Sequence, residues 1–171
     1  MRRLICILRG INVGGKRKIL MQDLRSLLEK DGFVNVKTYI QSGNIGFDSD
    51  KEIIQSVNKI ERLIKDNYGF DVPVIVIEQT KIQDIIEGMP YGVNENIHIT
   101  FLKEEPAIEK VNNLQINEFL PEEFKITPSA IYLKCVEKYH QSKLSNNFFE
   151  KKLGVTATTR NWKTVNKLVE L

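Results

Sequence analysis

A short basic segment near the N-terminus contains the residue types that bind anions. Residues 9–18 read RGINVGGKRK, with three glycines among four basic side chains. Glycine lets the backbone turn tightly and approach a ligand closely, and backbone amides beside Lys and Arg attract phosphate. The alternative is an ordinary connection whose basic side chains are solvated. We predict an anion site here, and its candidate residues are Arg9, Asn12, Gly14, Gly15 and Lys16.

Two other polar segments contain candidate partners for this loop. The sequence QSGN at 41–44 is typical of a tight hairpin turn, and the sequence TATTRNW at 156–162 precedes an amphipathic helix. Thr158 or Thr159 is predicted to cap that helix. An anion at the helix N-terminus would meet the positive end of its dipole. The additional candidate residues are Ser42, Asn44, Thr159, Arg160 and Asn161.

The charge of the chain is concentrated at its two ends. The first 18 residues contain six basic side chains and no acidic one, and residues 151–171 contain five basic and one acidic. The whole chain has a net charge of +3, so the residues between these segments are net acidic. If the ends meet, they form a positive surface that attracts phosphate or nucleic acid. We predict that the three polar segments converge on one pocket; scattered, solvated charge is the alternative.

Familiar catalytic and metal-binding motifs are absent from the sequence. It contains no HExxH, GxSxG or Walker A motif. Cys6 and Cys135 alternate with Leu or Ile, so we expect both to be buried and unpaired, which favours a reducing, cytoplasmic setting. The apolar runs are too short to cross a bilayer. We therefore predict no metal, no cofactor and no membrane partner, while enzymatic activity and oligomeric state stay open.

The order of the expected elements indicates an α+β fold. Strands are expected at 3–9, 34–40, 45–47 and 72–77, with one helix after residue 20 and another after residue 52. This strand–helix–strand–strand–helix–strand order is typical of a ferredoxin-like unit with an antiparallel sheet. The first ferredoxin-like half is assigned to residues 1–78, and a connecting helix and linker to 79–95.

A second ferredoxin-like half with a C-terminal helix is assigned to residues 96–171. Strands are expected at 97–101, 124–127 and 130–136, with helical patterns before and after the hairpin. Residues 156–159 lead directly into the final helix. The predicted architecture is therefore two ferredoxin-like halves with antiparallel sheets, the second ending in a helix instead of its last strand.

Three segments together resemble a known family. They are LRGINVGGKRKI at 8–19, YIQSGNIGF at 39–47 and TATTRNWKTVNKL at 156–168, and they resemble the bacterial domain-of-unknown-function family 1697. The resemblance covers essentially the whole chain, and the family's signature falls on residues 8–14, 41–44 and 158–162. It implies an α+β fold with ferredoxin-like halves. It implies no activity and no substrate.

The leading hypothesis is that the protein binds a phosphate-bearing ligand, a nucleotide or a nucleic acid at a basic polar site. In this hypothesis Arg9 and Arg160 supply charge, and the asparagines supply directional hydrogen bonds. One alternative is an enzyme acting on a small phosphorylated substrate, although the motifs contain no His, Cys or carboxylate. The other is a protein-interaction module with no ligand. Base stacking of the RNA-recognition-motif type needs aromatic residues on the first and third strands, and Phe47 is the one that the sequence offers.

Overall fold

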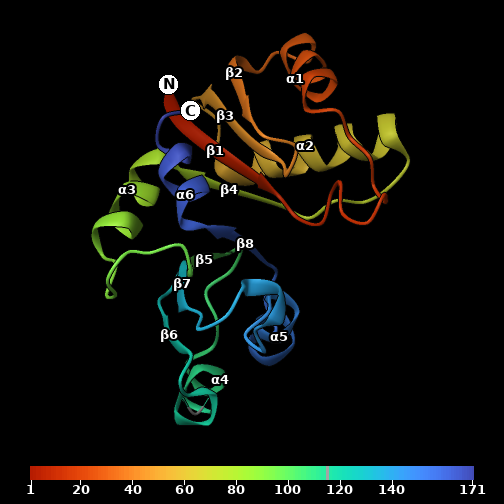
Figure 1. Cartoon of the computed structure of the whole chain (residues 1–171). Helices are drawn as coiled ribbons and strands as arrows, with labels where there is room; N and C mark the ends of the chain where they lie inside the picture. The colour runs from red at the N-terminus through yellow and green to blue at the C-terminus, as the bar shows by residue number, and fades with distance from the viewer. Residues whose placement is uncertain (115) are drawn as a thin grey trace. The chain divides into compact units, whose positions relative to one another are not determined.

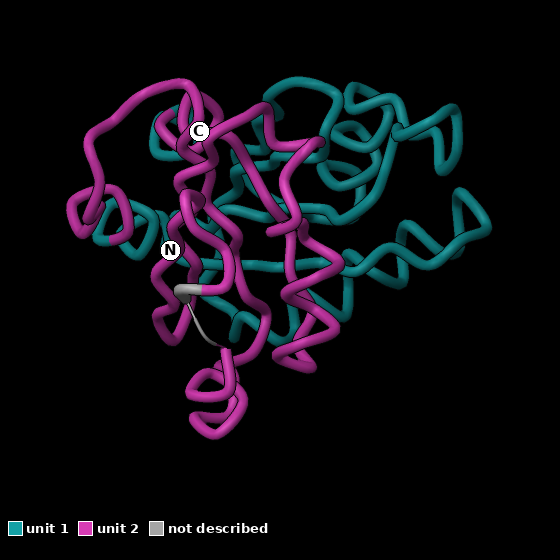
Figure 2. Tube along the Cα trace, turned by 60° about the horizontal axis from the view of Figure 1, so that its bottom comes forward, with its two compact units in different colours: residues 1–84, 167–171 teal, residues 85–166 magenta. Residues whose placement is uncertain are grey.

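The chain folds into two compact units. The computed structural model describes residues 1–114 and 116–171. Unit 1 contains residues 1–84 and 167–171, and unit 2 contains residues 85–166 (Figure 2). The sequence-based division places the last five residues in the second half, whereas the structure assigns them to unit 1. Arg3 of unit 1 donates a hydrogen bond to the Leu171 carbonyl oxygen, and Gln79 Nε2 donates to Val169 O at 2.8 Å.

Unit 1 contains a four-stranded antiparallel sheet with the strand order β2-β3-β1-β4 (Figure 1). Its elements are β1 (Arg2–Leu8), α1 (Met21–Lys30), β2 (Val34–Tyr39), β3 (Asn44–Ser49), α2 (Ile53–Tyr68) and β4 (Val74–Glu78), followed by the start of α3 (Gln79–Glu87). This is the predicted ferredoxin-like order. Two strands are shorter than predicted. β2 ends at Tyr39 and leaves Ile40 in the turn, and β4 begins at Val74, two residues later than expected.

The core of unit 1 lies between one face of the sheet and helices α1 and α2. Alternate residues of β1 point to this face, as the period of a strand requires. Leu24 of α1 and Ile60 of α2 are fully buried against them. On the other face, Leu171 packs against Gly46, where an added Cβ would lie 2.8 Å from Leu171 Cβ. A glycine on the central strand β3 therefore makes room for the end of the chain.

Unit 2 contains a second four-stranded antiparallel sheet with the order β6-β7-β5-β8. Its elements are the end of α3, β5 (Ile97–Leu102), α4 (Ile108–Asn112), β6 (Glu123–Ile126), β7 (Ala130–Lys134), α5 (Asn146–Leu153), β8 (Ala157–Asn161) and most of α6 (Trp162–Leu168), with short 3-10 helices at 116–119 and 139–141. The two predicted halves with antiparallel sheets are confirmed. The chain also ends in a helix, as predicted.

The prediction that the second half lacks its last strand is wrong. Residues Ala157–Asn161 form β8, which pairs with β5 from Ala157 opposite Leu102 to Asn161 opposite His98. Thr has a high β propensity, and β5 offers an open edge whose amides and carbonyls need partners. The helix α6 therefore follows the strand and does not replace it.

Two further local predictions can be compared with the structure. The predicted cap of the last helix at Thr158 or Thr159 is wrong, because both lie in β8, and Asn161 Oδ1 instead accepts a hydrogen bond from Thr164 N at 2.8 Å. Cys6 and Cys135 are buried and free, as predicted. In the part of the chain that the structure describes, no helix is both long and apolar enough to span a bilayer.

Candidate functional site

The loop after β1 has an unusual backbone. Five of its residues have positive φ angles, namely Gly10 (69°), Asn12 (55°), Gly14 (57°), Gly15 (74°) and Arg17 (48°). Glycine adopts this left-handed region at no steric cost, and Asn is among the residues that tolerate it best. A short antiparallel bridge between Val13 and Lys16 folds the tip back on itself. The loop 10–18, called the basic loop below, is therefore a compact hairpin-like turn.

Asn12 fixes the base of the basic loop. Its side-chain Nδ2 donates to Ile19 O at 2.8 Å, and its Oδ1 accepts from Ile19 N at 2.9 Å. The same Nδ2 donates to Gln41 O at 2.6 Å. A single carboxamide thus joins both ends of the loop to each other and to the turn between β2 and β3.

Gln41 is a second brace, and its role was not predicted from the sequence. Its Oε1 accepts from Met21 N at 3.2 Å, where α1 begins. The first amides of a helix have no partner within the helix, and the residue before α1, Leu20, has no side chain that can accept a hydrogen bond. Gln41 therefore takes the place of an N-cap from another part of the chain. No sequence pattern signals a cap that is supplied from so far along the chain.

The hairpin turn packs directly against the end of β1. Leu8 N donates to Gly43 O at 2.8 Å. A Cβ on Gly43 would lie 2.6 Å from Leu8 Cβ, and Gly43 also has a φ of +85°. Asn44 is fully buried, and its Nδ2 donates to Tyr39 O at 3.1 Å and to Ser42 Oγ at 3.0 Å. The predicted proximity of this turn to the basic loop is thus present within unit 1.

The basic side chains at the tip of the loop face solvent. Lys16, Arg17 and Lys18 are exposed, whereas Arg9 is half-buried and its backbone amide donates to Pro73 O at 3.0 Å. Throughout residues 1–114 and 116–171, no ion pair involves any of the three exposed cations. These three neighbouring positive charges give the tip of the loop a positive electrostatic potential.

The candidate residues of unit 2 have internal partners. Thr159 Oγ1 lies 2.8 Å from Thr100 Oγ1, and it also bonds with Tyr139 Oη and Asn146 Oδ1, each at 3.1 Å. Arg160 is half-buried, and its Nη1 donates to Thr158 Oγ1 and Thr159 O. The side chain of Asn161 caps α6. These contacts hold β8, α5 and α6 in place.

The ten predicted site residues therefore form two sets. Arg9, Asn12, Gly14, Gly15, Lys16, Ser42 and Asn44 lie together at one end of the sheet in unit 1, and Thr159, Arg160 and Asn161 lie at the end of β8 in unit 2. Their convergence on one pocket stays a prediction. The hydrogen bonds found for Asn12, Asn44 and Asn161 hold the backbone, so their amides have structural roles.

His98 lies beside the Thr159 network in unit 2. Its ring stacks on Tyr139 with a centroid distance of 4.8 Å, and its Nδ1 lies 3.2 Å from Asn96 O. Burial lowers the pKa of His98, and the carbonyl of Asn96 opposes this shift. The neutral form of the ring is therefore favoured in the folded protein. Among the described residues, no group of three His, Cys, Asp or Glu is placed to hold a metal ion.

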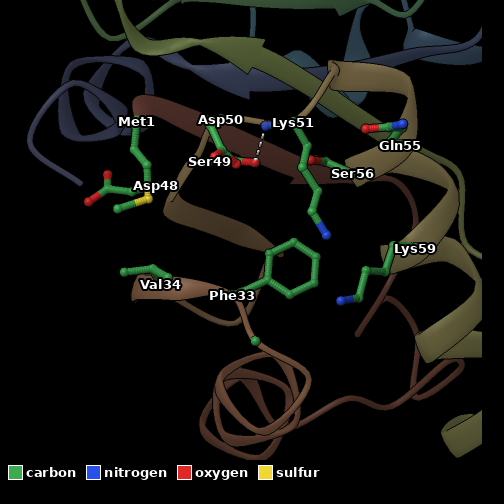
Figure 3. A pocket seen from close by; sticks show the side chains of 11 residues that line it. Met1, Phe33, Val34, Asp48, Ser49, Asp50, Lys51, Gln55, Ser56 and Lys59 are labelled. Carbon is green, nitrogen blue, oxygen red and sulfur yellow. Dashed lines mark hydrogen bonds between the residues drawn. The ribbon is translucent and has the colours of Figure 1, made fainter.

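A small cavity of about 80 Å³ lies elsewhere in unit 1, between the β3–α2 connection and the segment before β2 (Figure 3). Lys59 from α2 lies over the Phe33 ring at 5.1 Å and forms an ion pair of 2.8 Å with Asp31. Its charge is thus matched by a carboxylate and an aromatic face. We explain this cavity by the packing of α2 and do not assign it a ligand.

Comparison with known proteins gives a family but no activity. The family model described as "Protein of unknown function (DUF1697)" matches residues 1–132, which include the first two of the three sequence motifs. A solved structure, described as that of the conserved bacterial protein SP0830 from Streptococcus pneumoniae, has 25% identity and a TM-score of 0.77, covering 99% of this chain and 97% of that one. No curated protein matches the sequence. The chain belongs to the DUF1697 family.

Proposed function

We propose that the protein binds a phosphate-bearing ligand through the basic loop. The observation that carries this proposal is the brace at Asn12 and Gln41, which holds three consecutive exposed cations on a loop of fixed shape. A braced loop loses little conformational entropy when a ligand binds, and so more of the electrostatic attraction appears as affinity.

The contacts are divided between side chains and backbone. Lys16, Arg17 and Lys18 supply the charge, and Gly14 and Gly15 leave the loop amides open to a phosphate oxygen. A Cβ at either glycine would meet no atom within 4 Å, so glycine is not required there by lack of space. It is favoured because both residues have positive φ angles. Asn12 acts by fixing the base of the loop, while Ser42 and Asn44 fix the turn to which Asn12 is bonded.

Binding of soluble phosphate polymers tests this proposal. Fluorescence anisotropy is measured with inorganic polyphosphate and with a single-stranded RNA oligomer over a range of salt concentrations. The triple variant K16A/R17A/K18A should bind both probes more weakly. For RNA, the slope of log K against log salt should fall by about 2, since each phosphate contact on a single strand contributes about 0.7.

The matched control removes three exposed charges from unit 2 in the variant K125A/K151A/K152A. It has the same net charge as the loop variant, so nonspecific attraction falls equally in both. Equal binding by the two triple variants would overturn the proposal. The proposal would also be overturned if the wild-type protein bound neither polyphosphate nor RNA at low salt.

A further inference from the structure

Three exposed aliphatic side chains accompany the basic loop. Val13 is 68% exposed, Leu20 is 65% exposed and Ile40 is 49% exposed. After Met1, Val13 and Leu20 are the most exposed large hydrophobic side chains among the described residues. Single exposed hydrophobic residues are common on protein surfaces and need no explanation. A group of three exposed aliphatic residues that lie together does need an explanation. Val13, Leu20 and Ile40 are called the apolar rim below.

The hydrogen bonds of Asn12 and Gln41 bring the apolar rim to one end of the unit 1 sheet. Asn12 Nδ2 donates to Gln41 O at 2.6 Å, and these two residues directly adjoin Val13 and Ile40 in the chain. Gln41 Oε1 accepts from Met21 N at 3.2 Å, and Met21 directly follows Leu20. Each of the three aliphatic residues is therefore next in the chain to a member of one hydrogen-bonded group, which consists of Asn12, Met21 and Gln41.

Ile40 adopts a backbone conformation that is unfavourable for a β-branched residue. Its φ angle is +50°, and a β-branched residue in this left-handed region is rare because its side chain crowds the backbone. Glycine or asparagine would fit the turn without strain. The chain nevertheless places an isoleucine there and leaves half of it in water. Strain of this kind, maintained at an exposed position, indicates a role outside the fold.

The combination of aliphatic and basic side chains selects among phosphate-bearing ligands. Proteins hold single-stranded nucleic acid by stacking bases on aromatic rings, and the apolar rim contains none. Aliphatic side chains flanked by Lys and Arg match an anionic bilayer, which offers phosphate groups at its surface and acyl chains just below. The cytoplasmic leaflet carries this negative charge, in accord with the setting expected from two free cysteines.

We propose that the basic loop and the apolar rim bind the surface of an anionic phospholipid bilayer. The inference rests on the proposed function, because it identifies the phosphate-bearing ligand as lipid headgroups. Lys16, Arg17 and Lys18 contact the phosphates, while Val13, Leu20 and Ile40 enter the boundary between headgroups and acyl chains. This is peripheral binding, which requires no spanning segment. It replaces the expectation of no membrane partner, because that expectation rested on apolar runs too short to cross a bilayer.

Vesicle co-sedimentation separates this inference from the proposed function. The vesicles contain phosphatidylcholine alone, or phosphatidylcholine and phosphatidylglycerol in a two-to-one ratio. The wild-type protein should bind the mixed vesicles and not the neutral ones. The variant K16A/R17A/K18A should bind about a hundredfold more weakly, since each Lys or Arg near an anionic surface contributes about a factor of five.

The variant V13S/L20S/I40S tests the apolar rim. It should bind the mixed vesicles at least about tenfold more weakly and bind inorganic polyphosphate as the wild type does. The control I54S/I108S/L120S replaces three other exposed aliphatic residues and should bind vesicles normally. Unchanged vesicle binding by the rim variant would overturn the inference, and unchanged polyphosphate binding would leave the proposed function standing. Absence of polyphosphate binding by the wild-type protein would overturn the proposed function and, with it, the inference that rests on it.

A labelled variant gives a second measurement that does not remove the rim. Val13→Cys labelled with an environment-sensitive fluorophore should show a blue-shifted emission with the mixed vesicles, because the probe enters a less polar region. The native cysteines are both buried and so do not compete for the label. Ile108→Cys, labelled in the same way, should show no shift. Equal spectra for the Val13 probe with and without mixed vesicles would also overturn the inference.

Discussion

Asn12 and Ile19 are joined by two hydrogen bonds that close the basic loop. Asn12 Nδ2 donates to Ile19 O at 2.8 Å, and Ile19 N donates to Asn12 Oδ1 at 2.9 Å. The six residues between them include all three exposed cations, Gly14 and Gly15. One side chain therefore fixes the width of the loop and the approach of the chain to α1.

Replacement of Asn12 should destabilise the protein and loosen the basic loop. Asn12→Ala removes both hydrogen bonds to Ile19, and we expect a loss of about 1–3 kcal/mol because backbone groups lose their partners. Asn12→Gly removes the same bonds but relieves the positive φ angle, so it should be less destabilising by about 1 kcal/mol. Urea unfolding measures both variants. If Asn12→Ala were as stable as the wild type, the two hydrogen bonds to Ile19 would not stabilise the loop.

Gly43→Ala should be strongly destabilising. The new Cβ would lie 2.6 Å from Leu8 Cβ and 3.0 Å from Ile11 Cδ1, on a backbone with φ of +85°. Overpacking of a core of this kind costs about 1–3 kcal/mol, and the positive φ adds about 1 kcal/mol more. Thermal unfolding measures the effect. Gly14→Ala is the control, because it has a positive φ but no atom within 4 Å, so it isolates the conformational part.

Thr159→Val should test whether the polar network of unit 2 is structural. The substitution keeps the shape of the side chain but removes the hydroxyl that bonds with Thr100, Tyr139 and Asn146. We expect a loss of about 1–3 kcal/mol in urea unfolding, since partly buried partners are left unsatisfied. Thr156→Val, at a half-buried position in the same segment, should change stability little. Equal effects of the two substitutions would indicate that the network contributes nothing specific.

His98 should make stability depend on pH in the mildly acidic range. Burial lowers the pKa of His98 below its usual value of 6.5, so the unfolded chain takes up the proton more readily than the folded protein does. The stabilisation is complete above the pKa of the unfolded chain and is lost as the pH falls through the interval down to the lowered folded pKa. Urea unfolding of His98→Gln between about pH 8 and pH 5 should show a weaker decline than the wild type. His140→Gln, which changes an exposed histidine, should decline as the wild type does.

The sequence by itself determined the two antiparallel halves and the neighbourhood of the basic loop and the hairpin turn. Both follow from local patterns, because apolar periodicity identifies the strands and helices. The antiparallel pairing of strands one and three then brings the end of one beside the start of the other. The structure pairs Ile7 with Asn44 in this way. The free, buried cysteines were predicted on the same local grounds.

Only the tertiary structure decided the last strand and the roles of the amides. The Thr-rich segment Ala157–Asn161 becomes a strand because β5, about 60 residues earlier, offers an open edge, and no local pattern records an edge that distant residues create. An Asn or Gln side chain can form hydrogen bonds with a ligand or with the backbone, and the surrounding sequence does not distinguish the two. The folded chain places Asn12 and Gln41 where unpaired backbone groups need partners, and the same folding leaves Val13, Leu20 and Ile40 in water.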